Sequence, residues 1–242
     1  ADPSVRATVV VPVLAELGVG DLDPRADPIA LAAAAALCEA AGRVALPHPL
    51  PAALVRDRDG RPTAAVPAAV ARVDHADLFE AWRVGSLDGE SGGIARPAAG
   101  GRLGTRLGPF VGDLVVDGDD APPLADLLLH QTLVAWTVLG TVDRAVSLTV
   151  EHVNGRVQFG KPIAEFQAVQ FQLADAAVAV AGLRELAGFT LWRLDADPGG
   201  ARPDVLALRL HALEVARAVL RTCQQLHGAG LEASVVGRRE QH

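Results

Sequence analysis

The second half of the chain is dominated by three long stretches in which apolar residues recur at helical spacing. They run from Leu124 to about Val153, from Ile163 to about Leu194, and from Pro203 to about Leu226. Glycine and proline separate them at 155–162 and 197–200, where such residues end helices and form turns. Because long helices joined by short connections pack antiparallel, this part predicts a helical bundle.

The first half contains shorter elements of two kinds. Val9–Leu17 predicts a short helix, and the Ala-rich run Ile29–Ala41 predicts a longer one, with Pro28 in its first turn and Gly42 at its end. From residue 57 onward, Gly-Gly pairs and Asp-Gly steps alternate with short apolar runs, a pattern typical of hairpins. The sequence therefore predicts a mainly α fold with a small β domain: helical residues 1–56, a β domain over 57–120 and the bundle over 121–242.

Composition narrows the class of protein. Half of the residues are hydrophobic but only 4% are aromatic, with no Met or Tyr, so Ala, Val and Leu must form the core and favour closely packed helices. The net charge of −7 argues against nucleic acid as a partner. No apolar run of membrane-spanning length is free of charge, and no basic segment followed by an apolar one opens the chain, so we expect no membrane association and a cytoplasmic protein.

Two cysteines and one cluster of acidic residues and histidine are candidate sites of chemistry. Cys38 and Cys223 lie in apolar, helix-like surroundings and are interpreted as buried thiols. The run from Asp74 to Asp77 contains His75 but has no third ligand near it, so a strand-edge or turn role is favoured over zinc. No metal site is predicted.

One motif between the first two long stretches identifies a family. Residues 155–163 read Gly-Arg-Val-Gln-Phe-Gly-Lys-Pro-Ile, and Phe166-Gln167 and Leu173-Ala174-Asp175 follow. This order resembles the Arg-x-Gln-Phe-Gly-x-Pro-Ile, Phe-Gln and Leu-Ala-Asp signature of the acyl-CoA dehydrogenases, within their C-terminal helical domain. Together with a Gln-x-x-Gly-like segment from Gln225, the resemblance covers about half of the chain. It implies an acyl-CoA dehydrogenase-like fold with truncated N-terminal helical and middle β domains.

The resemblance also implies FAD as the cofactor, bound across a subunit boundary. An arginine beside an aromatic residue at a turn offers a fixed cation and a stacking surface, which suit a diphosphate and an adenine. By resemblance, the residues that would contact a neighbouring subunit's FAD are Arg156, Phe159, Gln167, Gln225, Gly228 and Ala229, the last two through a close-approaching loop backbone. The alternative is structural: Arg156 caps a helix and Gln225 lies at a helix end.

The features that hold the flavin and the catalytic base in the family are not found. The family's usual Glu lies beyond the point where this sequence ends, at Glu240-Gln241-His242, and the alternative position falls near His130 and Gln131, neither of which is a carboxylate. The β region lacks the Thr-Glu-Pro-type and Gly-Ser segments that hold the flavin ring in the family. No catalytic residue is therefore assigned to this chain.

These absences favour one function over two others. The resemblance implies a degenerate subunit that completes the FAD site of a catalytic partner, in an α2β2 acyl-CoA dehydrogenase of the actinobacterial sterol side-chain type, with a steroid-CoA as one candidate substrate. One alternative is a self-sufficient homo-oligomeric acyl-CoA dehydrogenase whose Glu lies outside this sequence. The other is a non-enzymatic helical scaffold.

Overall fold

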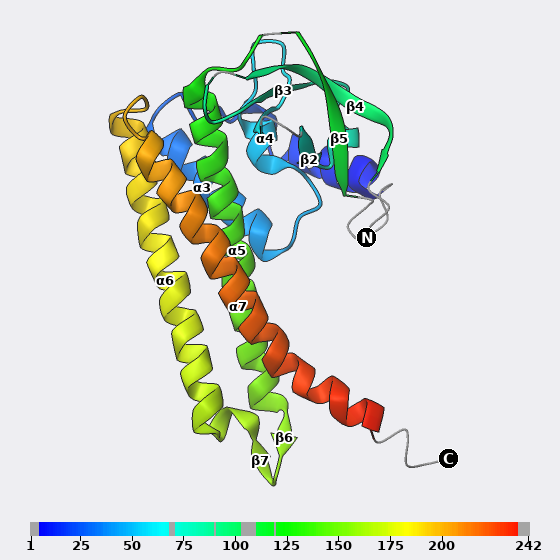
Figure 1. The fold of residues 1–242 in the computed structure, drawn as a ribbon, viewed down its shortest axis with the longest axis vertical. Coiled ribbons are helices and arrows are strands. Elements are labelled where there is room, and N and C mark those ends of the chain that lie inside the picture. The colour runs from blue at the N-terminus through cyan, green and yellow to red at the C-terminus, as the bar shows by residue number, and fades with distance from the viewer. Residues whose placement is uncertain (1–4, 68–70, 90, 103–109, 119, 237–242) are drawn as a thin grey trace.

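Three long helices form the body of the protein (Figure 1). The computed structural model describes residues 5–67, 71–89, 91–102, 110–118 and 120–236. Within them, α5 (Leu124–Gly155), α6 (Gln167–Ala196) and α7 (Arg202–Val236) pack as an antiparallel bundle. Its core consists of small and aliphatic side chains from all three helices, including Leu139, Leu183 and Leu208, each fully buried. The predicted bundle is confirmed, although α7 continues past its expected end to Val236.

Short helical elements precede the bundle and pack on one side of it. They are a π-helical turn (Arg6–Val10), α2 (Val11–Glu16), a 3-10 turn (Val19–Asp21), α3 (Pro28–Arg43) and α4 (Leu50–Leu54). The Asp27 side chain accepts a hydrogen bond from the Ala30 amide and caps α3, whose first residue is Pro28, as predicted for a helix start.

α3 ends at Arg43, so the end predicted at Gly42 is correct to within one residue. Gly42 also has a second role: a Cβ on it would overlap the carbonyl oxygen of Thr137 on α5, and a Cβ on Gly140 would likewise overlap the carbonyl oxygen of Glu39 on α3. The two glycines therefore allow the backbones of α3 and α5 to touch. A single-sequence pattern does not distinguish this close helix crossing from a helix end.

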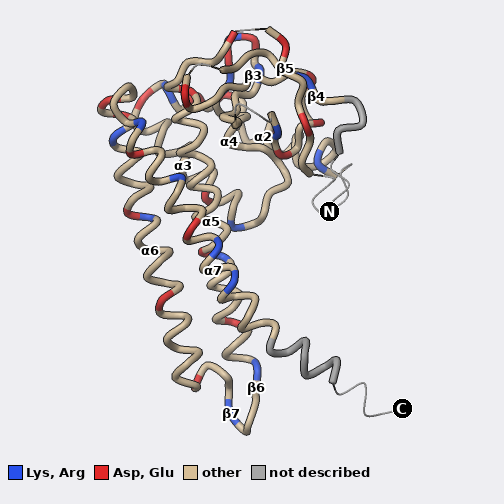
Figure 2. The backbone as a smooth tube through the Cα atoms, in the orientation of Figure 1, with Lys and Arg blue, Asp and Glu red and all other residues tan. Residues whose placement is uncertain are grey.

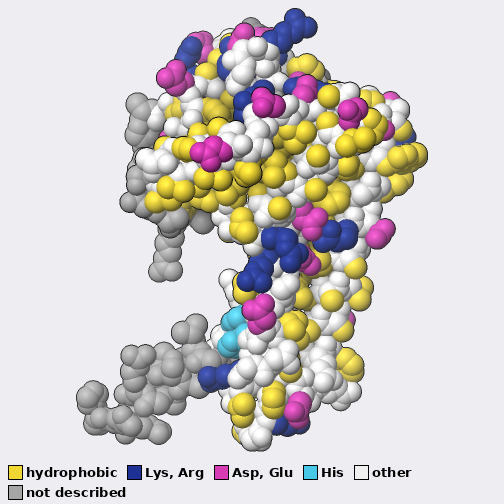
Figure 3. Space-filling model, turned by 180° about the vertical axis from the view of Figure 1, so that it is seen from behind, with side chains coloured by type: hydrophobic (Ala, Val, Ile, Leu, Met, Phe, Trp, Pro, Cys, Tyr) yellow, Lys and Arg dark blue, Asp and Glu magenta, His cyan; other side chains and the backbone are white. Residues whose placement is uncertain are grey.

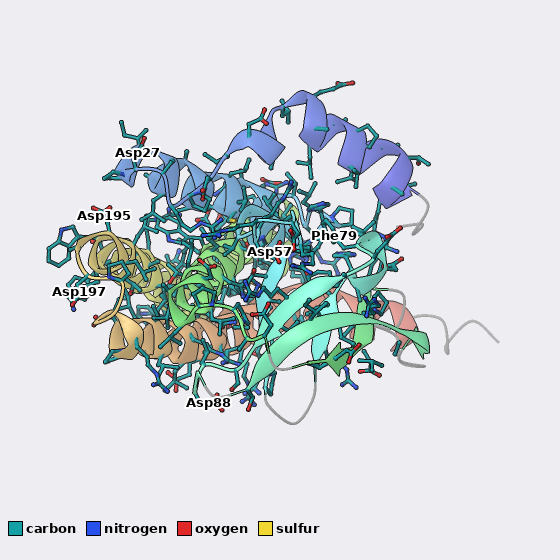
Figure 4. The ribbon with its side chains drawn as sticks, turned by 90° about the horizontal axis from the view of Figure 1, so that it is seen from above. Asp27, Asp57, Phe79, Asp88, Asp195 and Asp197 are labelled. Carbon is teal, nitrogen blue, oxygen red and sulfur yellow. The ribbon has the colours of Figure 1, made fainter. Side chains whose placement is uncertain are left out.

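A five-stranded sheet lies at one end of the bundle, beside α3 and α5 when seen from above (Figure 4). Its strands are β1 (Thr63–Ala65), β2 (Arg72–Asp74), β3 (Trp82–Gly85), β4 (Gly92–Arg102) and β5 (Val111–Asp117), in the order β1-β3-β4-β5-β2. β1 and β3 are parallel and the other pairs are antiparallel. The small β region predicted for this part of the chain is present, and the Trp82 side chain of β3 is fully buried in its core.

The glycines of the β region have two different roles. Gly60, Gly89 and Gly118 adopt positive φ, which confirms the turns predicted from the Asp-Gly steps. The pair Gly92–Gly93 lies within β4 instead, where a Cβ on Gly92 would be 2.5 Å from the Val84 carbonyl oxygen. The turn expected at this pair is wrong, because close strand contact rather than backbone bending requires its glycines.

Helix α5 connects all parts of the structure. It contacts α3, α6, α7 and β1, and Leu127, Leu128, Leu133 and Leu139 are fully buried along it. By length and composition alone it is also long and apolar enough to cross a membrane. In this fold it is the central helix, and the overall class is the predicted one: mainly α with a small sheet. The domain limits at residues 56 and 120 stay a prediction.

Candidate functional site

The motif between α5 and α6 folds into an exposed two-residue hairpin. β6 (Val157–Gln158) pairs with β7 (Lys161–Pro162), and the turn between them places Phe159 and Gly160 at φ 51° and 82°. Two consecutive residues with positive φ match the tight turns of β-hairpins. For Phe159 this is a strained conformation, and its side chain is 91% exposed. An aromatic side chain that is strained and almost fully exposed gains little from packing within this chain, which favours a role in binding.

Arg156 stands where α5 ends and the hairpin begins. Its backbone nitrogen donates to the His152 oxygen at 2.9 Å, and its carbonyl oxygen accepts from the Ile163 nitrogen at 2.8 Å. These contacts fix the backbone, but the side-chain Nε is buried and has no hydrogen-bond partner among the described residues. A buried unpaired donor is costly, so this guanidinium is suited to an anionic partner outside the chain.

The start of α6 extends this surface. Phe166 lies edge-on to Phe159, with ring centroids 6.2 Å apart, and the Lys161 Nζ lies 4.6 Å from the Phe166 centroid. Gln167 is the first residue of α6 and is exposed. Arg156, Phe159 and Gln167 therefore belong to one short, continuous segment, with a second basic residue held over an aromatic ring.

The segment from Gln225 to Ala229 is helical, contrary to the expected Gly-rich loop. Gln225 is exposed, but Gly228 and Ala229 lie inside α7 rather than in a Gly-rich loop. Leu226 is buried against Val153, and this contact supports the helix beyond its expected end. A Cβ on Gly228 would meet no atom of this chain, although glycine in a helix costs about 1 kcal/mol relative to alanine. The backbone amides of this part belong to a helix and not to an open loop.

A pair of histidines joins the two segments. His152 on α5 and His227 on α7 are stacked, with ring centroids 4.2 Å apart and planes at 28°. Burial, followed by the charges of His227 and Arg156, lowers the pKa of His152. Figure 3 shows histidine side chains on the surface of the lower bundle, close to basic side chains. The sequence analysis did not single out His152, because a contact between two helices leaves no local pattern.

A cavity of about 540 Å³ lies between the sheet, the α3–α4 connection and the bundle. The α5 residues His130 and Gln131 reach it, and both face strand β1: the His130 Nδ1 accepts from the Ala65 nitrogen at 3.2 Å, and the Gln131 Nε2 donates to the Ala65 oxygen at 3.5 Å. Burial and then the charge of Arg209 lower the pKa of His130 to about 4. At neutral pH both residues are therefore uncharged and fasten α5 to the sheet.

Asp74 on β2 also lines this cavity, and the sequence analysis missed its position. Asp74 is exposed, while the surrounding protein atoms raise its pKa and the charge of His75 opposes that shift. Asp74 enters from the sheet edge, and not from the α5 positions that the family resemblance identified. Only the folding of β2 against β5 brings it to the cavity.

The neighbouring His75 and Asp77 have a structural role. Arg6, 1% exposed, donates to both Asp77 carboxylate oxygens at 2.9 and 2.7 Å and lies 2.9 Å from the His75 Nδ1. His75 has a φ of 51°, so it occupies a turn. These contacts fasten the first helical turn to the sheet. Within the described residues, no group of three or more His, Cys, Asp or Glu side chains could hold a metal ion.

The two cysteines are free and buried, as predicted. Burial raises the pKa of the Cys38 thiol to about 12, against the opposing effect of its hydrogen bond with Thr137. A thiol with such a pKa is unreactive near neutral pH.

A family model matches the bundle. Residues 125–234 match the acyl-CoA dehydrogenase C-terminal domain. The hairpin, both histidines and the α7 segment all fall within this match. The helical part of the chain is therefore similar to the C-terminal domain of the acyl-CoA dehydrogenases, and the predicted resemblance is confirmed.

Curated relatives support the same assignment. The acyl-CoA dehydrogenase IpdE2 of Mycobacterium tuberculosis is 30% identical over 157 residues, covering 59% of this chain and 47% of the relative. The acryloyl-CoA reductase (NADH) of Anaerotignum propionicum is 37% identical over 90 residues, covering 37% of this chain and 23% of the relative. The chain thus spans less than half the length of these relatives.

Solved structures share the fold over most of the chain. A chain of the ChsE4–ChsE5 complex from M. tuberculosis has a TM-score of 0.63 at 21% identity, covering 81% of this chain and 69% of that one. A chain of the Tcur3481–Tcur3483 steroid ACAD G363A variant has a TM-score of 0.65 at 23% identity, covering 82% and 70%. Butyryl-CoA dehydrogenase from Megasphaera elsdenii has a TM-score of 0.58 at 18% identity, covering 84% and 73%. The predicted acyl-CoA dehydrogenase-like fold is therefore confirmed.

Proposed function

We propose that this chain is a subunit of an FAD-dependent acyl-CoA dehydrogenase and completes the FAD site of a catalytic partner chain. In this proposal the partner supplies the base that removes the α-proton of the acyl-CoA thioester. FAD, when bound, accepts the hydride from the β-carbon. The present chain binds and orients the dinucleotide part of that cofactor, in an α2β2 assembly.

The observation that carries the proposal is the Arg156 side chain. Its Nε is buried at the end of α5 without a hydrogen-bond partner among the described residues, although an arginine can donate five hydrogen bonds. Charge-assisted hydrogen bonds from guanidinium to phosphate are strong and directional. Because the Arg156 side chain is only partly buried, other donors of its guanidinium could pair with a diphosphate group outside the chain.

The exposed aromatic residue beside it fits the same ligand. Phe159 presents its ring to solvent from a strained turn, as a residue that stacks on a planar base would. Gln167 and Gln225 are exposed and could hydrogen-bond to the polar parts of the dinucleotide. Gly228, where a Cβ would meet nothing in this chain, leaves room for an outside molecule to approach α7.

The outer faces of the bundle support a partner subunit. Charged residues are sparse along α6 (Figure 2). Large apolar side chains are exposed instead on α6 and α7: Phe171, Val178, Phe189, Trp192, Leu206, Leu210 and Leu213. Gly182 and Gly188 on α6 also have open space around them. Surfaces of this kind mark protein interfaces, and these helices would meet the partner chain.

The residues of the cavity support the assignment of the base to the partner. The α5 positions nearest to the family's alternative base are His130 and Gln131, which are uncharged at neutral pH and hydrogen-bonded to β1. Asp74, from the sheet edge, is the carboxyl group among the residues lining the cavity. An assembled complex that keeps its turnover after Asp74→Asn supports the proposal, and an abolished turnover would assign the base to this chain.

For the substrate we propose a steroid-CoA thioester, since one structural relative is a steroid ACAD. The complex would then oxidise steroid-CoA thioesters faster than linear acyl-CoAs, and the reverse order would reject this substrate class. A cytoplasmic location is also proposed, because both thiols are unpaired, as is usual in reducing compartments.

The native assembly provides the experiment that separates the candidate functions. The tagged chain is isolated from its source with its partners, and the subunits and bound flavin are quantified. The proposal predicts two kinds of chain and one FAD per two chains. A yellow homo-oligomer with one FAD per chain would instead indicate a self-sufficient enzyme, and a colourless product in every assembly would indicate a scaffold.

A further inference from the structure

The candidate FAD-binding residues come from two separate parts of the bundle. Arg156 and Phe159 lie at the end of α5 and in the hairpin, whereas Gln225 and Gly228 lie on α7. A single ligand can contact both parts only if the two helices keep a fixed relative position at this end. A contact that sets this position would therefore affect binding without touching the ligand.

The stacked histidines are placed to provide this contact. His152 is one helical turn before Arg156, whose backbone nitrogen donates to the His152 oxygen. His227 lies between Gln225 and Gly228 in the sequence. The rings are 4.2 Å apart and nearly parallel, so the stack joins one part of the site directly to the other.

A small apolar cluster also joins the helices at this level. Leu226 on α7 is buried and shares this cluster with Val153 and Ile163. The stack lies beside this cluster, because each histidine adjoins one of its members in the sequence. The apolar cluster limits the distance between the helices, and the stacked rings add a preferred orientation.

We infer that His152 and His227 are positioning residues, whose ring stack holds the α7 part of the candidate dinucleotide site in register with Arg156. This inference rests on the proposed function, since the site it aligns is the one proposed above. It assigns the histidines no contact with substrate and no proton transfer. The stack requires two flat rings, and a charge on them is not needed.

The test uses the assembled complex containing FAD and compares three variants of this chain. His227→Ala removes the stack and is expected to weaken FAD binding about tenfold, as estimated from the loss of one aromatic pair. His227→Phe keeps a flat ring that cannot be charged and is expected to restore binding to within about twofold of the wild type. Gln224→Ala, at an exposed neighbouring position on α7, serves as the control and is expected to bind FAD normally.

A second measurement needs no cofactor. In the full chain, the titration of the His152 ring is followed by NMR with and without His227. The structure predicts that the pKa of His152 moves back towards its ordinary value in His227→Ala, since the neighbouring imidazole and part of the burial are removed. An unchanged titration would show that the rings do not stack, and it would overturn the inference.

The outcomes separate this inference from the proposed function. If His227→Ala binds FAD as the wild type does, or if His227→Phe binds as weakly as alanine, the positioning role is wrong while the proposed function stands. If Arg156→Ala also leaves FAD binding unchanged, the proposed function itself fails. Weak binding by alanine, rescue by phenylalanine and a shifted His152 titration together support the inference.

Discussion

The clearest test of the structure is the loss of stability in acid that His130 should cause. Its Nδ1 accepts a hydrogen bond from the Ala65 nitrogen, and its side chain is buried between α5 and the sheet, with the charge of Arg209 near it. A proton on this ring would remove the acceptor and place a cation in the interior. His130→Gln is the perturbation, because an amide oxygen can accept the same hydrogen bond without titrating.

The size of this stability loss follows from the change in the pKa of His130 on folding. Folding lowers the pKa of His130 from 6.5 to about 4, so the unfolded chain binds a proton at a pH where the folded chain does not. The resulting stability is fully present above pH 6.5, falls as the pH falls, and is lost near pH 4. The difference corresponds to about 3 kcal/mol of unfolding free energy.

Urea unfolding of the wild type and of His130→Gln between pH 7.5 and 4 provides the assay. His48 titrates in the same range, since burial lowers its pKa to about 4 as well, but it is common to both proteins and cancels in the difference. The wild type should lose about 3 kcal/mol relative to the variant over this interval. Two parallel stability curves would refute the interpretation that His130 is buried and neutral.

Three further predictions concern single positions. Gly140→Ala should destabilise the chain by about 3 kcal/mol or more, because the new Cβ overlaps the Glu39 carbonyl oxygen. Gly188→Ala, with open space around it, should instead stabilise the chain by about 1 kcal/mol. Thermal unfolding compares the two variants, and equal effects on stability would reject the close crossing of α3 and α5. Phe159→Gly should stabilise the isolated chain by about 1 kcal/mol by relieving positive φ yet lower the FAD content of the complex, and normal FAD content would exclude a binding role. Cys38, with its pKa raised to about 12, should resist a thiol reagent at pH 8 in the folded chain, and rapid labelling would contradict its burial.

The sequence predicted the elements well where local patterns determine them. Helical spacing and flanking Pro and Gly located α5, α6 and the start of α7, and Asp-Gly steps located turns at Gly60 and Gly89. It failed where the reason for a residue is a distant contact. Gly42 marked the helix end but not the helix crossing that it also serves, and Gly92 looked like a turn but serves strand packing.

In the candidate site, too, the sequence predicted the residues of a local motif but not the contacts between distant residues. Arg156 and Phe159 were identified because they share a short ordered motif, and the structure adds the unpaired Nε and the strained turn. The partnership of His152 with His227 was not identifiable, because these residues are far apart in the sequence and meet only after α5 and α7 pack. A single sequence does not show which residues far apart along the chain come into contact in the fold.

The central claim is that Arg156 completes a neighbouring subunit's FAD site, and the FAD affinity of the assembled complex tests it most directly. Arg156→Ala is compared with Arg144→Ala, a nearby α5 arginine whose exposed ion pair with Glu151 spans 3.5 Å and contributes little to stability. Our account predicts that Arg156→Ala weakens FAD binding about 10- to 100-fold by removing charge-assisted hydrogen bonds, while Arg144→Ala and the unfolding temperature of the chain stay unchanged. Equal FAD affinity of the wild type and Arg156→Ala would contradict it.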